Sequence, residues 1–164
     1  MKEREYDRKK AINYAKKWAF DRNPIYYNFD GVGGDCTSFV SQCIYEGSMI
    51  MNYNKNGWFY KNGNNRSPAW SGVEFLYDFL INNKGVGPYG IRIPMNEIDL
   101  GDIIQLSFDG KNFGHSLIVV KIKKPIKLDN IFIAAHTYDS YNKPISEYSF
   151  QKVRFIHLEK VRFW

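Results

Sequence analysis

One cysteine, Cys36, occupies a position where a thiol could act as a nucleophile. It follows the glycine-rich stretch 31–34 and Asp35, and it opens a segment with helical periodicity. Unpaired N–H groups and the dipole at a helix N-terminus favour the thiolate, which is the reactive form of cysteine. We therefore interpret Cys36 as a candidate nucleophile whose backbone N–H contributes to an oxyanion hole, with a buried structural cysteine as the alternative.

The second cysteine, Cys43, lies seven residues further along the same expected helix. Two residues at that spacing are about 10 Å apart along a helix axis. A disulfide needs Cα atoms closer than about 7 Å. We therefore predict two free thiols, with Cys43 in the core.

A nucleophilic thiol needs a base, and the chain has three histidines. His115 opens an expected strand, 115–122, and His136 follows another, 130–135. If these strands pair antiparallel, both histidines lie at the same edge of the sheet. His115 would then take the thiol proton and return it to a leaving amine. His136 would orient the His115 imidazole, and Asp139 is the alternative residue for that role. The third histidine, His157, is interpreted as structural or surface-exposed.

Two other chemistries could use residues of the same region. Zinc could be bound by a set drawn from Cys36, His115, His136 and either Asp35 or Asp139. No CxxC or HxxxH pair is present to chelate a metal locally, so no metal is expected. The glycines at 31–34 have no GxxxxGK[ST] continuation, which argues against a phosphate site, and no cofactor is expected.

The elements that must position these residues can be identified from periodicity. An amphipathic helix is predicted over 7–20, capped by Asp7, and a second helix starts at Cys36 with Gly47 as its stop. A third helix is predicted over 71–82, with a capping box at 71–74. Strands are predicted at 102–108, 115–122, 130–135 and 153–158, and a loop at 82–90. Helices first and strands second indicate an α+β fold with an antiparallel sheet.

Composition sets the limits of the functional interpretation. The 164 residues, 44% of them apolar, predict one domain spanning 1–164 with a substantial core. No run is long and apolar enough for a transmembrane segment, and no signal-peptide pattern is visible. The net charge of +6 favours anionic partners in general, such as nucleic acid, an anionic polymer or a membrane surface, with a plain solvated basic surface as the alternative. No zinc finger or RNP-type strand supports a nucleic-acid binder.

Several short motifs resemble a bacterial family, the putative amidase domain family. The matching segments, in chain order, are Tyr6-Asp7-Arg8, Tyr14-Ala15, Trp18-Ala19, Asn23 to Phe29, Gly34 to Cys43, Ala69-Trp70, Leu100 to Ile104, Gly114-His115-Ser116 and Ala135-His136-Thr137. The usual core of that family is DCTNFVSQ, and this chain has Ser38 in place of the asparagine. The later motifs are also similar to the wider NlpC/P60 and CHAP papain-like superfamily.

The resemblance implies a papain-like α+β fold, in which a cysteine-bearing helix packs on a small antiparallel sheet. It maps the nucleophile to Cys36, the base to His115 and the orienting residue to His136. It places Tyr26 where it would line the site or support the oxyanion.

The implied function is cysteine-dependent hydrolysis of amide bonds, most directly in cell-wall peptidoglycan peptides. Asp35, Trp70 and Asp139 are further candidates for substrate binding or oxyanion support. Tyr26, Trp58, Trp70 and Tyr138 are aromatic residues that could line the cleft, with packing in the core as the alternative for each ring. The alternative is a wall- or partner-binding module without turnover. Localisation stays open, because the resemblance favours an exported or wall-associated protein while this chain shows no signal peptide.

Overall fold

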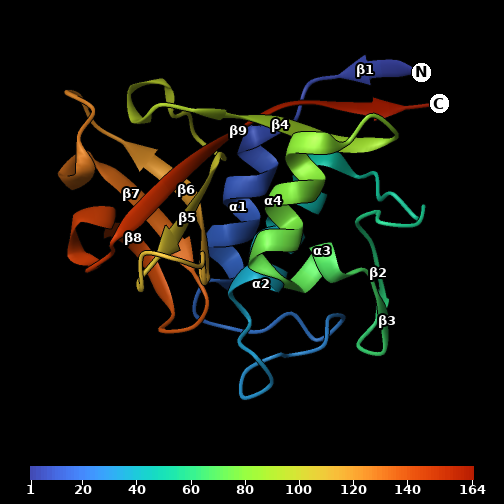
Figure 1. The fold of residues 1–164 in the computed structure, drawn as a ribbon, viewed down its shortest axis with the longest axis horizontal. Coiled ribbons are helices and arrows are strands. Elements are labelled where there is room, and N and C mark those ends of the chain that lie inside the picture. Colours follow the sequence, from blue (N-terminus) through green and yellow to red (C-terminus); the bar gives the residue numbers. More distant parts are fainter.

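The computed structural model describes residues 1–164 and has an α+β fold (Figure 1). The helices are α1 (Arg8–Trp18), α2 (Cys36–Ser48), α3 (Pro68–Ser71) and α4 (Val73–Asn82). The strands are β1 (Lys2–Arg4), β2 (Tyr60–Asn62), β3 (Asn65–Arg66), β4 (Gly87–Ile93), β5 (Ile103–Ser107), β6 (His115–Ile122), β7 (Ile131–Ala135), β8 (Ser140–Pro144) and β9 (Lys152–Phe163). The predicted class is therefore confirmed.

The main sheet is antiparallel throughout and has seven strands in the order β1-β9-β5-β6-β7-β8, with β4 also paired to β9. Helices α1 and α2 pack on β6, on one face of this sheet (Figure 1). The core between helices and sheet includes Phe39, Ile44 and Ile118. The opposite face carries a second core that includes Leu117 and Ile133. Successive residues of β6 therefore point alternately into the two cores.

Helix α1 forms as predicted from its pattern. The side chain of Asp7 accepts a hydrogen bond from the Lys10 backbone N–H at 3.0 Å, which caps the helix. Ala11, Tyr14 and Ala15 are buried on its inner face. The lysines before and after them, at 9, 10, 16 and 17, stay exposed, so the amphipathic stripe places the helix on the sheet.

Helix α2 begins at Cys36, as predicted, but it does not stop at Gly47. The helix continues through Ser48, and Met49 then takes the left-handed conformation with a φ of 57°. Gly47 is needed for a different reason: any Cβ there would collide with the ring of Tyr6 and the backbone of Asp7. The glycine permits close packing rather than ending the helix.

The predicted capping box at 71–74 is wrong, and the predicted single helix is two. Ser71 is the last residue of α3, and its hydroxyl accepts from Arg66 Nε at 2.9 Å. Gly72 is the N-cap of α4, so the helix lacks a side-chain cap. Glu74 instead accepts a hydrogen bond from the Phe113 backbone N–H at 3.3 Å.

Strand β4 lies partly where a loop was predicted at 82–90. Its glycine- and proline-containing sequence lacks strand periodicity, yet it pairs along β9 from Gly87 opposite Arg162 to Ile93 opposite Phe155. Strand β9 is accordingly longer than the predicted 153–158. No helix of the protein has the length and apolar character required to cross a membrane.

Candidate active site

Cys36 and His115 lie at adjoining ends of α2 and β6. The residues that follow them, Thr37 and Ser116, are joined by a hydrogen bond of 2.9 Å between their hydroxyls. The Cys36 sulfur lies 3.7 Å from Thr37 Oγ1, and it makes no hydrogen bond with the imidazole of His115. Both side chains are nearly buried, with 8% of Cys36 and 5% of His115 exposed. The candidate nucleophile and base are therefore neighbours in the fold, but no hydrogen bond joins the thiol to the imidazole.

A polar chain continues from this link beneath α4. Gln105 donates from Nε2 to Ser116 Oγ at 3.2 Å and accepts from Arg154 at 2.9 and 2.6 Å. The guanidinium of Arg154 lies between the rings of Tyr77 and Phe113, at 3.6 and 3.9 Å from their centroids. Buried polar groups are thus satisfied along a continuous path, which holds the start of β6 rigidly against α2.

The ring of His115 belongs to the second core, on the side of Leu117. Its centroid lies 6.2 Å from that of Phe108 and 5.7 Å from that of Tyr148. Burial, assisted by the charge of Lys143, lowers the pKa of His115 from 6.5 to about 4. His115 is therefore neutral near pH 7, and its ring nitrogens make no hydrogen bond within the protein. A neutral imidazole with a free nitrogen can accept a proton.

Tyr148 was not predicted from the sequence, and it lies next to His115. Its hydroxyl is buried and makes no hydrogen bond within the protein. The neighbouring Ser140 hydroxyl donates to the Tyr138 carbonyl at 2.8 Å. Lys143 Nζ lies 4.0 Å from the centroid of the tyrosine ring. Burial raises the pKa of Tyr148, the nearby Ser140 hydroxyl opposes part of this increase, and the charge of Cys36 adds to it. No local pattern in the sequence distinguishes this tyrosine from the others.

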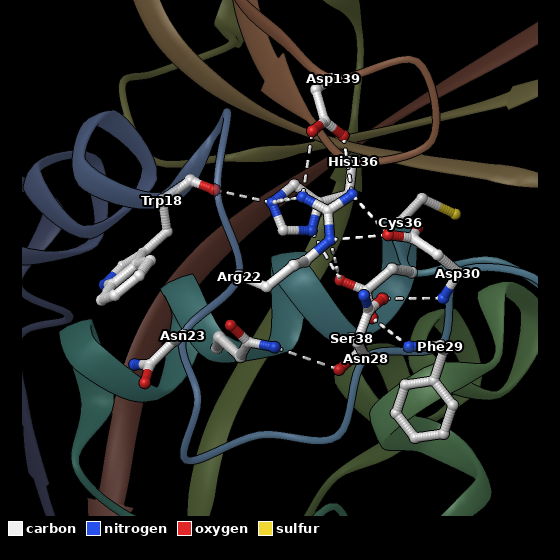
Figure 2. A network of polar contacts seen from close by, with 12 residues as sticks. Trp18, Arg22, Asn23, Asn28, Phe29, Asp30, Cys36, Ser38, His136 and Asp139 are labelled. Atoms are coloured by element: carbon white, nitrogen blue, oxygen red, sulfur yellow. Dashed lines mark hydrogen bonds and ion pairs between the residues drawn. The ribbon is translucent and has the colours of Figure 1, made fainter.

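The sequence predicts that His136 contacts His115, but in the structure His136 has other hydrogen-bond partners. Its Nδ1 lies 2.6 Å from Asp35 Oδ2, and its Nε2 lies 2.7 Å from the Trp18 carbonyl oxygen (Figure 2). Nε2 also lies 3.2 Å from the Arg22 guanidinium, so both ring nitrogens are engaged by groups other than His115. Figure 2 shows the Cys36 sulfur pointing away from this ring. The structure therefore does not bring His136 to His115, and instead ties it to the residue that precedes Cys36.

Arg22 connects the remaining acidic candidates, and it too was not predicted. Its guanidinium binds Asp139 at 2.9 and 3.0 Å and Asp30 at 2.8 Å, and it lies 3.7 Å from Asp35 (Figure 2). Burial opposes the charged form, but the hydrogen bonds and charges of Asp139 and Asp30 raise the pKa of Arg22. Asp35 is itself buried and accepts from the Phe29 backbone N–H at 3.0 Å. This network fixes the loop that leads into α2.

The predicted aromatic candidates are divided between the core and the surface. Trp70 is fully buried and donates from Nε1 to Ser38 Oγ at 3.2 Å. It therefore cannot contact a substrate, which corrects its prediction as a substrate-binding residue. Trp58 is also fully buried. Tyr26 stacks on Trp70, with 5.6 Å between ring centroids, and its charged neighbours include Glu46, in the second half of α2. No hydrogen bond or ring contact joins Tyr26 to Cys36 or His115, and Tyr138 is 88% exposed.

The two cysteines and the side chains that could bind a metal ion are also described by the structure. Both cysteines are free thiols, as predicted from their spacing. No three side chains among histidine, cysteine, aspartate and glutamate come together in a way that could hold a metal ion. His157 lies outside the site, with Nδ1 2.8 Å from Asp102 Oδ2.

Fold and site together define an α+β protein with a cysteine at a helix N-terminus beside a histidine at a sheet edge. Residues 5–158 match the model of the putative amidase domain family, and the chain belongs to this family. Membership indicates hydrolysis of the amidase type.

A relative is known in Bacillus subtilis (strain 168), where the uncharacterized protein YhbB is 37% identical over 142 residues. The match covers 83% of this chain and 43% of YhbB, so the chain spans less than half the length of that relative. No solved structure matches the chain.

Proposed function

We propose that this protein is a cysteine-dependent amide hydrolase with a papain-like arrangement, in which Cys36 is the nucleophile and His115 the base. The observation that carries the proposal is the 2.9 Å hydrogen bond between Thr37 and Ser116, because it holds the residues next to Cys36 and His115 together. Family membership supports amide-bond chemistry. His136 and Asp35 serve as positioning residues for the start of α2, rather than as members of the proton path.

The reaction begins with the neutral His115 imidazole taking the proton of the Cys36 thiol. Catalytic hydrogen bonds are often long in the absence of substrate, and this contact tightens when substrate is bound. The thiolate attacks the amide carbonyl and the amide C–N bond breaks, so an acyl-enzyme forms as the amine leaves with the proton from His115. Water then attacks the thioester carbonyl, and His115 accepts its proton while the carboxylic acid is released and the thiol is restored.

The oxyanion of the tetrahedral intermediate needs donors that are already in place. The backbone N–H of Cys36 is unpaired at the start of α2 and supplies one such donor. The partnerless hydroxyl of Tyr148 is a second candidate, because it is buried near Cys36 and keeps its proton as its pKa is raised. Tyr148 takes over the role that the resemblance gave to Tyr26.

The proposed substrate is a peptide of the cell wall, and the compartment is accordingly extracytoplasmic. The basic surface, with a net charge of +6, suits an anionic wall polymer. Transfer of the acyl group to an amine instead of water would use the same first steps. A module that binds wall polymer without turnover is the alternative, and it needs no reactive thiol.

The test combines alkylation, turnover and mass spectrometry on the intact protein. Iodoacetamide should label Cys36 and leave Cys43 untouched, because burial raises the pKa of the Cys43 thiol and shields it. Purified peptidoglycan peptides should be hydrolysed by the native protein and by the control Cys43→Ser, but not by Cys36→Ser. His115→Gln should slow the labelling of Cys36 and allow no acyl-enzyme to accumulate.

The outcomes separate enzyme from binding module. Wall binding with no hydrolysis, unchanged in Cys36→Ser, would establish the binding module and reject the proposal. Equal labelling rates in the native protein and His115→Gln would remove His115 as the base, even if hydrolysis is observed.

A further inference from the structure

A cavity of about 570 Å³ lies away from the Cys36 site, between the loop 52–57 that precedes β2 and the outer side of α4. Neither Cys36 nor His115 lines it. In Figure 1 the chain leading to β2 lies on the opposite side of α4 from strands β6, β7 and β8. Cavities of roughly 300–1,000 Å³ accommodate small organic ligands. This cavity is therefore large enough to be a binding site of its own.

Two buried asparagines hold the walls of the cavity in place. Asn52 pairs with Trp58 through two backbone hydrogen bonds of 2.8 Å, and its side chain accepts from the Asn54 N–H at 2.9 Å. It also donates to the Val86 carbonyl at 3.0 Å. Asn83 donates to the Pro88 carbonyl at 2.9 Å. The loop and the end of α4 are thus anchored to the same segment, and the cavity exists before any ligand enters.

Polar side chains that face the cavity have unused hydrogen-bonding capacity. The exposed amides of Asn54 and Asn56 make no hydrogen bond within the protein, and each offers two donors and an acceptor. Asn82 uses one donor on the Asp78 carbonyl at 2.9 Å and keeps its amide oxygen free. The Asp78 carboxylate makes no ion pair. The cavity therefore combines donors and acceptors at close spacing.

An exposed aromatic ring stands beside these groups on the same face of α4. Phe75 is 59% exposed, and it precedes Asp78 by three residues and Asn82 by seven. Residues at these spacings form one row along a helix. The exposed ring of Phe75 therefore lies next to the Asp78 carboxylate and the Asn82 amide. The buried ring of Phe79 also lines the cavity.

We infer that this cavity is a saccharide-binding site. Neighbouring sugar hydroxyls both donate and accept, which matches the amides of Asn54, Asn56 and Asn82 and the Asp78 carboxylate. The C–H face of a pyranose ring packs on an aromatic ring such as Phe75. The inference is independent of the proposed hydrolysis, since it uses no residue of the Cys36 site. If the protein acts on cell-wall peptides, as proposed above, this cavity would bind the glycan part of the wall.

The experiment is an NMR titration of the ¹⁵N-labelled protein with three trisaccharides, namely chitotriose, cellotriose and maltotriose. At least one should shift the side-chain NH₂ signals of Asn54, Asn56 and Asn82 at millimolar concentration. Phe75→Ala and Asn82→Ala should each weaken binding by roughly five- to tenfold. The matched controls Phe20→Ala and Asn64→Ala change exposed residues elsewhere and should bind as the native protein does.

Cys36→Ser should bind the saccharide unchanged, which separates this site from the proposed active site. No shift at these amides with any of the three sugars would overturn the inference. Inorganic phosphate is the competing probe, because Lys55 and Lys84 also line the cavity and make no ion pair. Shifts with phosphate alone would assign an anion site and reject a saccharide site.

Discussion

Asp35 and His136 form a buried pair, with 2.6 Å between the Asp35 carboxylate and His136 Nδ1. The two residues are 101 positions apart in the sequence, and only 1% of each is exposed. Because Asp35 directly precedes Cys36, this pair connects the end of β7 to the first turn of α2. Arg22 lies against the pair and extends it to Asp139.

Replacing Arg22 should loosen this connection. Arg22→Met leaves the Asp30 and Asp139 carboxylates without their cation, and it should lower the free energy of unfolding by about 2 kcal/mol. Arg22→Lys keeps the charge but cannot bridge both carboxylates, so about half of that loss is expected. Denaturant unfolding measures both values. The control Arg92→Met removes an exposed arginine without an ion pair, and a loss as large there would show that the network contributes nothing specific.

The depressed pKa of His115 makes stability depend on pH. The unfolded chain binds a proton near pH 6.5 and the folded chain only near pH 4, so unfolding takes up a proton between these values. Stability should therefore fall as the pH is lowered from 6.5 to 4, by up to about 3 kcal/mol from this residue. His115→Gln should flatten the profile over this window, as measured by urea unfolding at several pH values. An unchanged slope in the variant would contradict the buried, neutral state.

Tyr148→Phe should separate stability from activity. The variant removes a buried hydroxyl that has no partner, so the free energy of unfolding should rise by about 1 kcal/mol. If this hydroxyl stabilises the oxyanion, kcat should fall at least tenfold in the more stable protein. Tyr14→Phe is the matched control, because its hydroxyl donates to Gln42 at 2.6 Å, and it should lose about 1 kcal/mol instead. Full activity in Tyr148→Phe would exclude the hydroxyl from the reaction.

The turn between β7 and β8 stores backbone strain that substitution should release. Thr137 and Tyr138 have positive φ values of 61° and 60°, which residues other than glycine, asparagine and aspartate adopt at a cost. The double change Thr137→Asn, Tyr138→Gly supplies residues that adopt positive φ values at little cost and should raise stability by about 1 kcal/mol. The reverse change at another left-handed position, Asn142→Thr with a φ of 57°, should lower it. Thermal unfolding of the variants decides the sign, and a destabilised double variant would disprove the strain.

Sequence patterns were sufficient for the elements that carry the candidate nucleophile and base. The amphipathic stripe and Asp7 define α1, and the boundary at Asp35 defines the start of α2. The β-branched runs after His115 and before His136 define β6 and β7. Antiparallel pairing of these strands then places both histidines at one edge, because pairing of this kind follows from local hydrophobicity and short connections.

The hydrogen-bond and packing partners of the site residues could not be predicted from sequence patterns. Periodicity indicates which face of an element is buried, but it does not indicate which polar groups meet after burial. His136 is predicted beside His115 but is bonded to Asp35. Trp70 is a candidate for lining the cleft but lies in the core, which was its alternative role. Arg22 and Tyr148 act through contacts with residues far away in the sequence, and no motif marks them.

The sequence by itself determined the α+β class, the free thiols and the placement of Cys36 at a helix N-terminus, because these depend on local spacing and side-chain type. Only the tertiary structure decided the neutral state of His115, the partnerless hydroxyl of Tyr148 and the clamp of Arg22 on the loop before α2. Desolvation and long-range hydrogen bonds produce these properties, and both exist only once β6, β7 and α2 have packed together.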